Sequence, residues 1–156
     1  MSQSECGDET AIRLHEQVIE LVRKYQFRDR NAVCCYGISV SQCYLLEELA
    51  RRGPATNSEL AAVLCVAVST VTRIVDQLVA KDYVERIEDL RDRRVRRVAL
   101  TEAGRGLYEV LWSAVMESEK AILRNFPQEE QAALIRFLEK FNVAVDQWRR
   151  QSGCNC

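Results

Sequence analysis

The chain of 156 residues lacks the features that would identify a zinc protein, a membrane protein or a strongly charged protein. It has one histidine, His15, which excludes a histidine-rich zinc site. Its longest apolar run, AAVLCVAV, is far shorter than the roughly 20 residues of a membrane-spanning helix. The polar start, MSQSECGDET, does not resemble a secretory signal. With 47% hydrophobic and 29% charged residues, we expect a soluble cytoplasmic protein with no membrane partner.

The chain also has almost no net charge: its formal net charge is −1 and its pI is about 6.0. General electrostatic attraction to nucleic acid is therefore excluded, and any such binding must come from a local patch. Between residues 86 and 97, six arginines accompany three acidic residues, which gives this segment a net charge of +3. The positive charge of the chain is thus localised, and its function has to be sought there.

Two helices are predicted at the start of the chain. Apolar residues recur with helical spacing over residues 10–30, and residues 31–37, NAVCCYG, then look like a loop. Ser39 and Gln42 fit the S-x-x-Q pattern of a capping box, and Gly53 with the proline after it would end the second helix.

A helix-turn-helix and a hairpin are predicted next. Thr56 and Glu59 open a helix of barely two turns, and a polar-faced helix over residues 68–82 follows. The apolar face of that helix is expected to contain Val71, Ile74, Val75 and Leu78. The β-branched segments 83–88 and 94–101 then predict two strands joined by the arginine-rich DLRDR.

Thr101 is a good N-cap for a long helix, and a proline with two following glutamates favours a last one. The length fits a single domain, residues 1–156. We therefore expect a mainly α fold with a small two- or three-stranded antiparallel sheet. In that fold a winged helix-turn-helix, residues 39–101, lies between long dimerisation helices at 10–30 and 107–150.

The segment from Asp89 to Arg105 carries D-x-R-D-x-R, a hydrophobic strand and L-T-x-x-G-R in turn. Together with SELAAVL and STVTRIVDQLVAKDYVER before it, this segment resembles the MarR (multiple antibiotic resistance regulator) family of bacterial transcription factors. The resemblance covers roughly residues 10–150. It implies a DNA-binding regulator, whose relatives commonly bind aromatic effectors between the dimerisation helices and the DNA-binding lobe.

The arginine patch has a physical explanation in duplex DNA. A recognition helix fits the major groove, while a hairpin beside it can place arginine in the narrow, negative minor groove. Short hydroxyls near a helix start suit phosphates or close base contacts, and arginine can reach guanine or grip the backbone. The candidate DNA-binding residues are Ser69, Thr70, Thr72 and Arg73 on the helix and Arg91, Arg93 and Arg94 on the hairpin. We expect Arg91 and Arg93 in the minor groove.

Two acids accompany these cations. By resemblance, Asp76 forms an ion pair with Arg94 that orients the hairpin, and Asp92 has a similar local role. The alternative for Asp76 is an ordinary solvated acid. The alternatives for the arginines are that they form an ordinary solvated charged face, or that they protect a strand edge against aggregation.

The helix over residues 68–82 departs from the family pattern at both ends. Cys65 and Ala67 stand in the turn before it, where a small polar cap is expected, so its start is less well capped. Asp82 stands where glycine commonly ends this helix, and it can adopt the left-handed conformation at some cost.

A dimer is expected on two grounds. One recognition helix buries too little surface to select a genomic site, so such domains commonly bind palindromic duplexes as twofold dimers. The apolar stripes of the terminal helices also exceed what a small lobe can cover. We expect residues 10–30 and 107–150 of two chains to interleave, although packing within one chain is the alternative. The buried positions would include Leu134, Leu138, Phe141, Val145 and Trp148.

Seven cysteines, an odd number, cannot all pair within the chain. Cys34, Cys35 and Cys43 lie around the loop before the second helix and are candidate sensors of oxidants. Their thiolates could instead bind a soft metal ion or arsenite. Ordinary packing is the third possibility, and it applies most to Cys43 and Cys65.

The sequence thus predicts a homodimeric transcriptional repressor that leaves its operator when an aromatic ligand binds or its cysteines are modified. A winged-helix module that binds protein, or a thiol protein that binds metal, is the alternative. An enzyme is not expected, because a single distant histidine gives no assembled pair of nucleophile and base.

Overall fold

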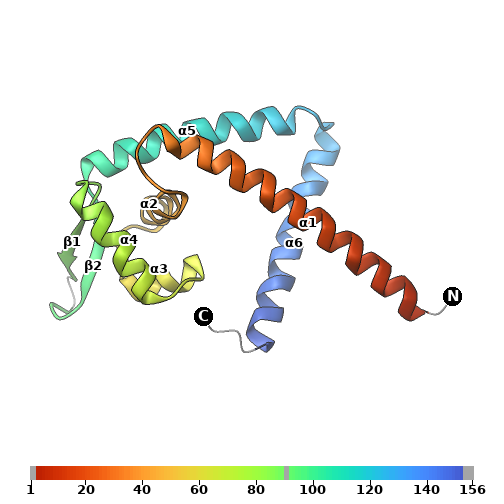
Figure 1. The fold of residues 1–156 in the computed structure, drawn as a ribbon, viewed down its shortest axis with the longest axis horizontal. Coiled ribbons are helices and arrows are strands. Elements are labelled where there is room, and N and C mark those ends of the chain that lie inside the picture. Colours follow the sequence, from red (N-terminus) through yellow and green to blue (C-terminus); the bar gives the residue numbers. More distant parts are fainter. Residues whose placement is uncertain (1–2, 90–91, 153–156) are drawn as a thin grey trace. The chain divides into compact units, whose positions relative to one another are not determined.

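The computed structural model describes residues 3–89 and 92–152, apart from the side chains of residues 3–7, Ala32 and Cys34. The chain divides into two compact units, residues 1–43 and 44–156, which are described separately. The elements are α1 (Gln3–Cys34), α2 (Val40–Arg52), α3 (Asn57–Leu64), α4 (Val68–Ala80), β1 (Val84–Glu88), β2 (Arg96–Leu100), α5 (Glu102–Leu123) and α6 (Gln128–Gln151) (Figure 1). The expected mainly α fold with a small antiparallel sheet is confirmed.

The first unit differs from its prediction in the length of its helix. α1 continues to Cys34, so most of the loop expected over residues 31–37 is helical. The segment contains neither proline nor glycine before Gly37, whose positive φ of 65° turns the chain. The predicted capping box then opens α2, because Ser39 and Gln42 each accept a hydrogen bond from the other's backbone N–H.

Residues 44–100, here called the lobe, contain most of the hydrophobic core. Its fully buried side chains come from α2, α3, α4 and both strands: Leu45, Leu46, Leu60, Val71, Val75, Leu78, Val84 and Val98. The predicted stripe of α4 is confirmed, since Val71, Ile74, Val75 and Leu78 are all buried. Each such side chain contributes about 1.5–3 kcal/mol relative to an exposed one. The inner face of α4 is therefore fixed, and its outer face is presented to solvent.

The hairpin pairs β1 and β2 in antiparallel register, from Val84 opposite Leu100 to Glu88 opposite Arg96. A third strand is present only as one bridge between Ala55 and Val98, with hydrogen bonds of 2.8 and 3.1 Å. This bridge ties the connection between α2 and α3 to the hairpin. Figure 1 shows the hairpin lying beside α4.

The L-T-x-x-G-R segment joins the hairpin to α5. The Thr101 hydroxyl accepts from the Gly104 N–H at 3.0 Å and donates to the Asp82 carbonyl at 2.6 Å. A Cβ on Gly104 would lie 1.9 Å from the Tyr83 carbonyl oxygen, so only glycine fits this close approach. Asp82 adopts the left-handed conformation, φ 60°, as the sequence predicts. These contacts fix where α5 leaves the lobe.

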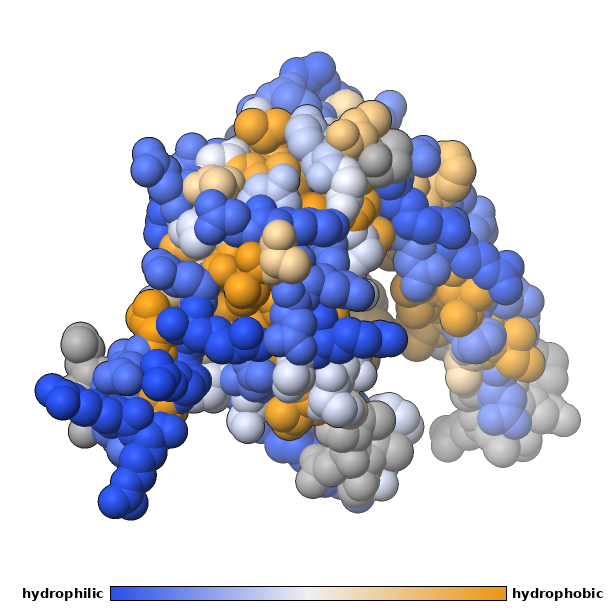
Figure 2. All heavy atoms as spheres, turned by 60° about the vertical axis from the view of Figure 1, so that its left-hand side comes forward, coloured by the Kyte–Doolittle hydropathy of each residue, from blue (hydrophilic) through white to orange (hydrophobic). Residues whose placement is uncertain are grey.

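The long helices expose many apolar side chains. In α6, which the structure describes throughout, no residue is buried, and Leu134, Leu138, Val145 and Trp148 are exposed. Figure 2 likewise shows hydrophobic side chains reaching the surface among charged ones. No single described helix is long and apolar enough to span a membrane, and α3 with α4 meets that test only jointly, with a bend of 111°.

Candidate nucleic-acid interface

The outer face of α4 carries the residues that the sequence singled out. Ser69 and Arg73 are exposed, and Thr70 is half-buried. The buried stripe on the opposite side packs this helix against the lobe, so these side chains are held on a rigid element. The helix starts at Val68, and the preceding residue, Ala67, has no side chain that could cap it, as expected.

Thr72, the remaining candidate on α4, connects two helices. Its hydroxyl donates to the Val68 carbonyl at 3.0 Å and accepts from the Asn57 amide nitrogen at 3.0 Å. Asn57 is the first residue of α3, so this contact ties the start of α3 to α4. A hydroxyl has one proton to donate, and the Val68 carbonyl takes it.

The predicted ion pair between Asp76 and Arg94 is wrong in its partner. The Asp76 carboxylate accepts from Arg86, which lies on β1. The strand follows α4 after a tight turn, and this brings Arg86 beside the helix, whereas Arg94 lies at the far end of the hairpin. The pair still connects the hairpin to α4, although an ion pair this exposed contributes only about 0–1 kcal/mol.

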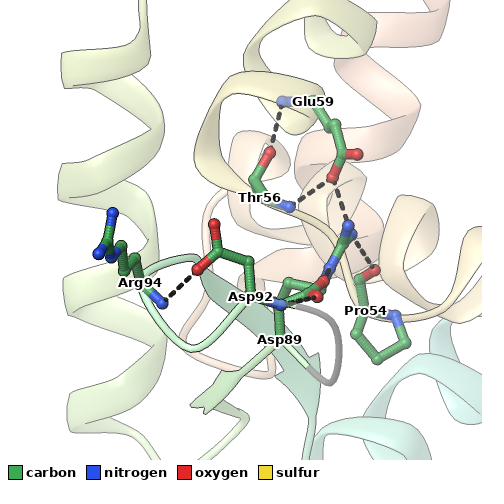
Figure 3. A network of polar contacts seen from close by, with 7 residues as sticks. Pro54, Thr56, Glu59, Asp89, Asp92 and Arg94 are labelled. Carbon is green, nitrogen blue, oxygen red and sulfur yellow. Dashed lines mark hydrogen bonds and ion pairs between the residues drawn. The ribbon is translucent and has the colours of Figure 1, made fainter.

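Asp92 takes part in two local hydrogen bonds at the hairpin tip. Its carboxylate accepts from the Arg94 backbone N–H at 2.9 Å, and its own N–H donates to Asp89 at 3.1 Å (Figure 3). These bonds shape the turn and leave Arg93 and Arg94 exposed. Arg91 lies outside the described residues. Figure 2 shows that the hairpin surface is strongly hydrophilic.

Arg97 is a residue of the site that the sequence analysis missed. Its guanidinium donates to the Pro54 carbonyl and to the Glu59 carboxylate, each at 3.1 Å, and also to Asp89 (Figure 3). One side chain thus joins β2 to the α2–α3 connection, to the capping box of α3 and to the base of the hairpin turn. Its partners lie up to 43 residues away in the sequence, so no local pattern indicates them.

The charges of this network shift two pKa values. The pKa of Glu59 is lowered, mainly because the Thr56 backbone N–H donates to its carboxylate, and further because Arg97 is close. The hydrogen bond to Asp89 raises the pKa of Arg97. Both groups therefore keep their charges at neutral pH, and the network is intact there.

A cleft of about 350 Å³ separates the start of α3 from the hairpin. Three of its lining residues are arginines, and three come from the first turn of α3 and its cap. They are Thr56, Asn57, Ser58, Arg86, Val95, Arg96, Arg97 and Val98. Guanidinium groups next to a helix start suit a backbone phosphate.

The structure shows no metal site at those candidate sensor cysteines whose side chains it describes. Cys35 is exposed and Cys43 is half-buried, while the side chain of Cys34 lies outside the description. Among the residues that the structure describes, no group of three His, Cys, Asp or Glu could hold a metal ion. Cys65 is exposed rather than in the core, and with a φ of 56° it forms the left-handed turn between α3 and α4.

Comparisons with known proteins agree with this geometry. The MarR family model matches residues 38–95. The chain is 33% identical to the HTH-type transcriptional regulator YpoP of Bacillus subtilis over 89 residues, which cover 57% of this chain and 63% of YpoP. It is 30% identical to the regulator YsmB of the same organism over 105 residues, which cover 67% of this chain and 72% of YsmB.

A solved structure extends the likeness to nearly the whole chain. A MarR family protein from Bacillus stearothermophilus superposes with a TM-score of 0.81 at 25% identity, covering 89% of this chain and 97% of that protein. The likeness therefore includes the long terminal helices as well as the lobe.

Proposed function

Because this chain belongs to the MarR family of winged helix-turn-helix transcriptional regulators, we propose that it is a homodimeric repressor that binds a palindromic duplex operator. One observation carries the proposal. α4 is anchored by a buried stripe, and its opposite face presents Ser69 and Arg73 beside an arginine-rich hairpin. A helix held in this way can enter the major groove while the hairpin reaches the adjacent minor groove.

The proposed contacts with DNA are of two kinds: contacts to bases, which recognise the sequence, and contacts to phosphates, which position the lobe. Arg73 reads guanine or grips a phosphate, and Ser69 and Thr70 contact the backbone or nearby base edges from the first turn of α4. Arg93 and Arg94, with Arg91, approach the minor groove from the hairpin tip. The cleft between α3 and the hairpin supplies phosphate contacts that fix the register of the lobe.

A second copy of the chain completes the regulator. The exposed apolar residues of α6 and those of α1, such as Ile12 and Phe27, are more than a monomer in water would leave uncovered. Two copies that bury these faces would place two recognition helices about one helical turn apart, as a palindrome requires. A dimer of that span blocks access to a promoter, which makes it a repressor.

Binding of DNA is tested by selecting bound sequences from random duplexes and then varying the salt. We expect one palindromic motif and a linear fall of log affinity with log salt concentration. Arg93→Ala and Arg94→Ala should each reduce the salt slope by about one, whereas Lys140→Ala on α6 should not. The same negligible affinity for every duplex at low ionic strength would contradict the proposal.

Release from the operator is proposed to follow a small aromatic ligand or modification of Cys34, Cys35 or Cys43 by oxidant, soft metal ion or arsenite. The exposure of Cys35 supports a thiol that reagents can reach. DNA release is measured with peroxide, arsenite and phenol as separate arms, on the wild type and on a Cys34→Ser, Cys35→Ser double variant. Sensing by Cys34 or Cys35 predicts that only the phenol response survives in the variant, with Cys65→Ser as the control, whereas sensing by Cys43 would leave the thiol responses in place. Release by peroxide unchanged in the double variant would exclude these two thiols.

A further inference from the structure

The N-cap of α4 and the first residue of the helix are apolar, whereas a polar N-cap would stabilise the helix. A Ser, Thr, Asn or Asp at the N-cap commonly stabilises a helix, but this position holds Ala67, and the next residue, Val68, is 46% exposed. An exposed valine contributes little to the stability of the lobe. Its side chain is therefore free of the core and accessible to a ligand that approaches α4.

Thr72 extends this apolar surface. It follows Val68 by four residues and so lies on the same face of the helix. Its hydroxyl is held by the Val68 carbonyl and the Asn57 amide, each at 3.0 Å, so its proton is not available to a base. The methyl group is the part of this half-buried side chain that has no such bond to make. Val68 and Thr72 thus lie on one flank of α4, adjacent to the face that carries Ser69 and Arg73.

We propose that Val68 and the Thr72 methyl group read the 5-methyl group of a thymine in each half-site. This inference rests on the proposed function and names a specificity determinant of the same interface. In the major groove, thymine alone among the four bases presents a methyl group, and apolar side chains recognise it by contact. Arg73, one residue further along α4, can read guanine, so the half-site combines a methyl-bearing and an acceptor-bearing base.

The test compares thymine with uracil, which differs from it only by this methyl group. The selected operator is synthesised with deoxyuridine in place of each thymine in turn, at symmetric positions in both half-sites. We expect one position at which the substitution weakens wild-type binding about fourfold per half-site, the equivalent of one lost apolar methyl contact. At the other positions the affinity should be unchanged.

Matched variants assign the effect to the two residues. Val68→Ala and Thr72→Ser should each show a smaller difference between the thymine and uracil duplexes than the wild type, and the double variant should bind the two almost equally. Each substitution removes methyl contact, and Thr72→Ser keeps the hydroxyl that bonds Val68 and Asn57. Val79→Ala removes another exposed valine of α4 and should retain the full difference between thymine and uracil. Circular dichroism of the variants checks that the helices are intact.

The failures are distinguishable. If the wild type binds every uracil duplex as tightly as the thymine duplex, the inference is overturned while DNA binding stands. If Val68→Ala and Thr72→Ser lower the affinity for both duplexes by the same factor, the residues act on the structure and not on the methyl group, which also overturns it. If no duplex is bound at all, the proposed function itself fails.

Discussion

The lobe and the last helix differ in where their apolar residues go. In the lobe, Leu45, Leu60 and Leu78 are at most 2% exposed, whereas on α6 Leu138 is 42% and Trp148 is 62% exposed. Both regions have amphipathic helical sequences, so the pattern alone does not distinguish them. The lobe thus buries its apolar residues within one chain, whereas α6 leaves its apolar residues exposed, and we propose that a second copy covers them.

The largest effect is expected from Gly104→Ala at the edge of the lobe. Its Cβ would lie 1.9 Å from the Tyr83 carbonyl oxygen, and the backbone must shift to accept it. We expect a loss of about 3 kcal/mol in the free energy of unfolding, the upper range for overpacking. Urea denaturation followed by circular dichroism measures it.

Gly106→Ala is the matched control in the same helix. No described atom lies within 4 Å of the position of its added Cβ, so alanine should stabilise α5 by about 0.5–1 kcal/mol. Equal effects of the two substitutions would show that the close approach at Gly104 does not hold in solution.

The second prediction concerns the face of α6. A Leu134→Asp, Leu138→Asp double variant should leave the lobe folded, because neither residue is buried in one chain. It should raise the dissociation constant of the dimer more than about a hundredfold, since about 1.5–3 kcal/mol is lost per leucine that a dimer buries. Sedimentation equilibrium measures the dimer, and Lys140→Ala is the control. A double variant that stays dimeric would place the interface elsewhere.

The third prediction concerns Arg97, which holds the hairpin to the rest of the lobe. Arg97→Met removes the bonds to Pro54, Glu59 and Asp89, so the hairpin loses its fixed position. We expect about a tenfold loss of operator affinity, the factor that corresponds to one typical hydrogen bond.

Arg96→Met is the comparison for Arg97, because it removes the same charge from the same strand. Arg96 forms an exposed ion pair with Glu88, within the hairpin itself. Its side chain is 61% exposed, against 30% for Arg97. Both variants should reduce the salt slope by a similar amount, so a larger affinity loss in Arg97→Met reports positioning. Equal affinities would mean that Arg97 acts on DNA by charge alone.

The sequence predicted those parts of the fold that have local signatures. The capping boxes at Ser39 and Thr56, the left-handed Asp82 and the stripe of α4 depend on residues a few positions apart, and all are confirmed. The partner of Asp76 and the role of Arg97 depend on contacts across the lobe, which spacing does not encode. The end of α1 was missed because the asparagine and the glycine that bound NAVCCYG favour a turn, although the residues between them also fit a last helical turn.

The smallest expected effect is the pH dependence that Glu59 adds to the lobe. Its pKa in the folded protein lies below its usual value of 4.5, mainly because of the hydrogen bond from the Thr56 backbone N–H. A lowered pKa means that the ionised carboxylate stabilises the fold above its usual pKa, and that this contribution is lost as the pH falls through the folded value. Between about pH 5 and pH 3, the unfolding free energy of the wild type should therefore fall more steeply than that of Glu59→Gln. Glutamine keeps the capping geometry without the charge, so urea titrations of both proteins at each pH isolate the effect of the charge.

The dimer dissociation constant is the control. Its dependence on pH over the same range should be identical in the two proteins, because Glu59 belongs to the lobe and not to α6. A parallel fall of the two unfolding curves would show that the Glu59 charge contributes nothing to holding α3 and Arg97 together.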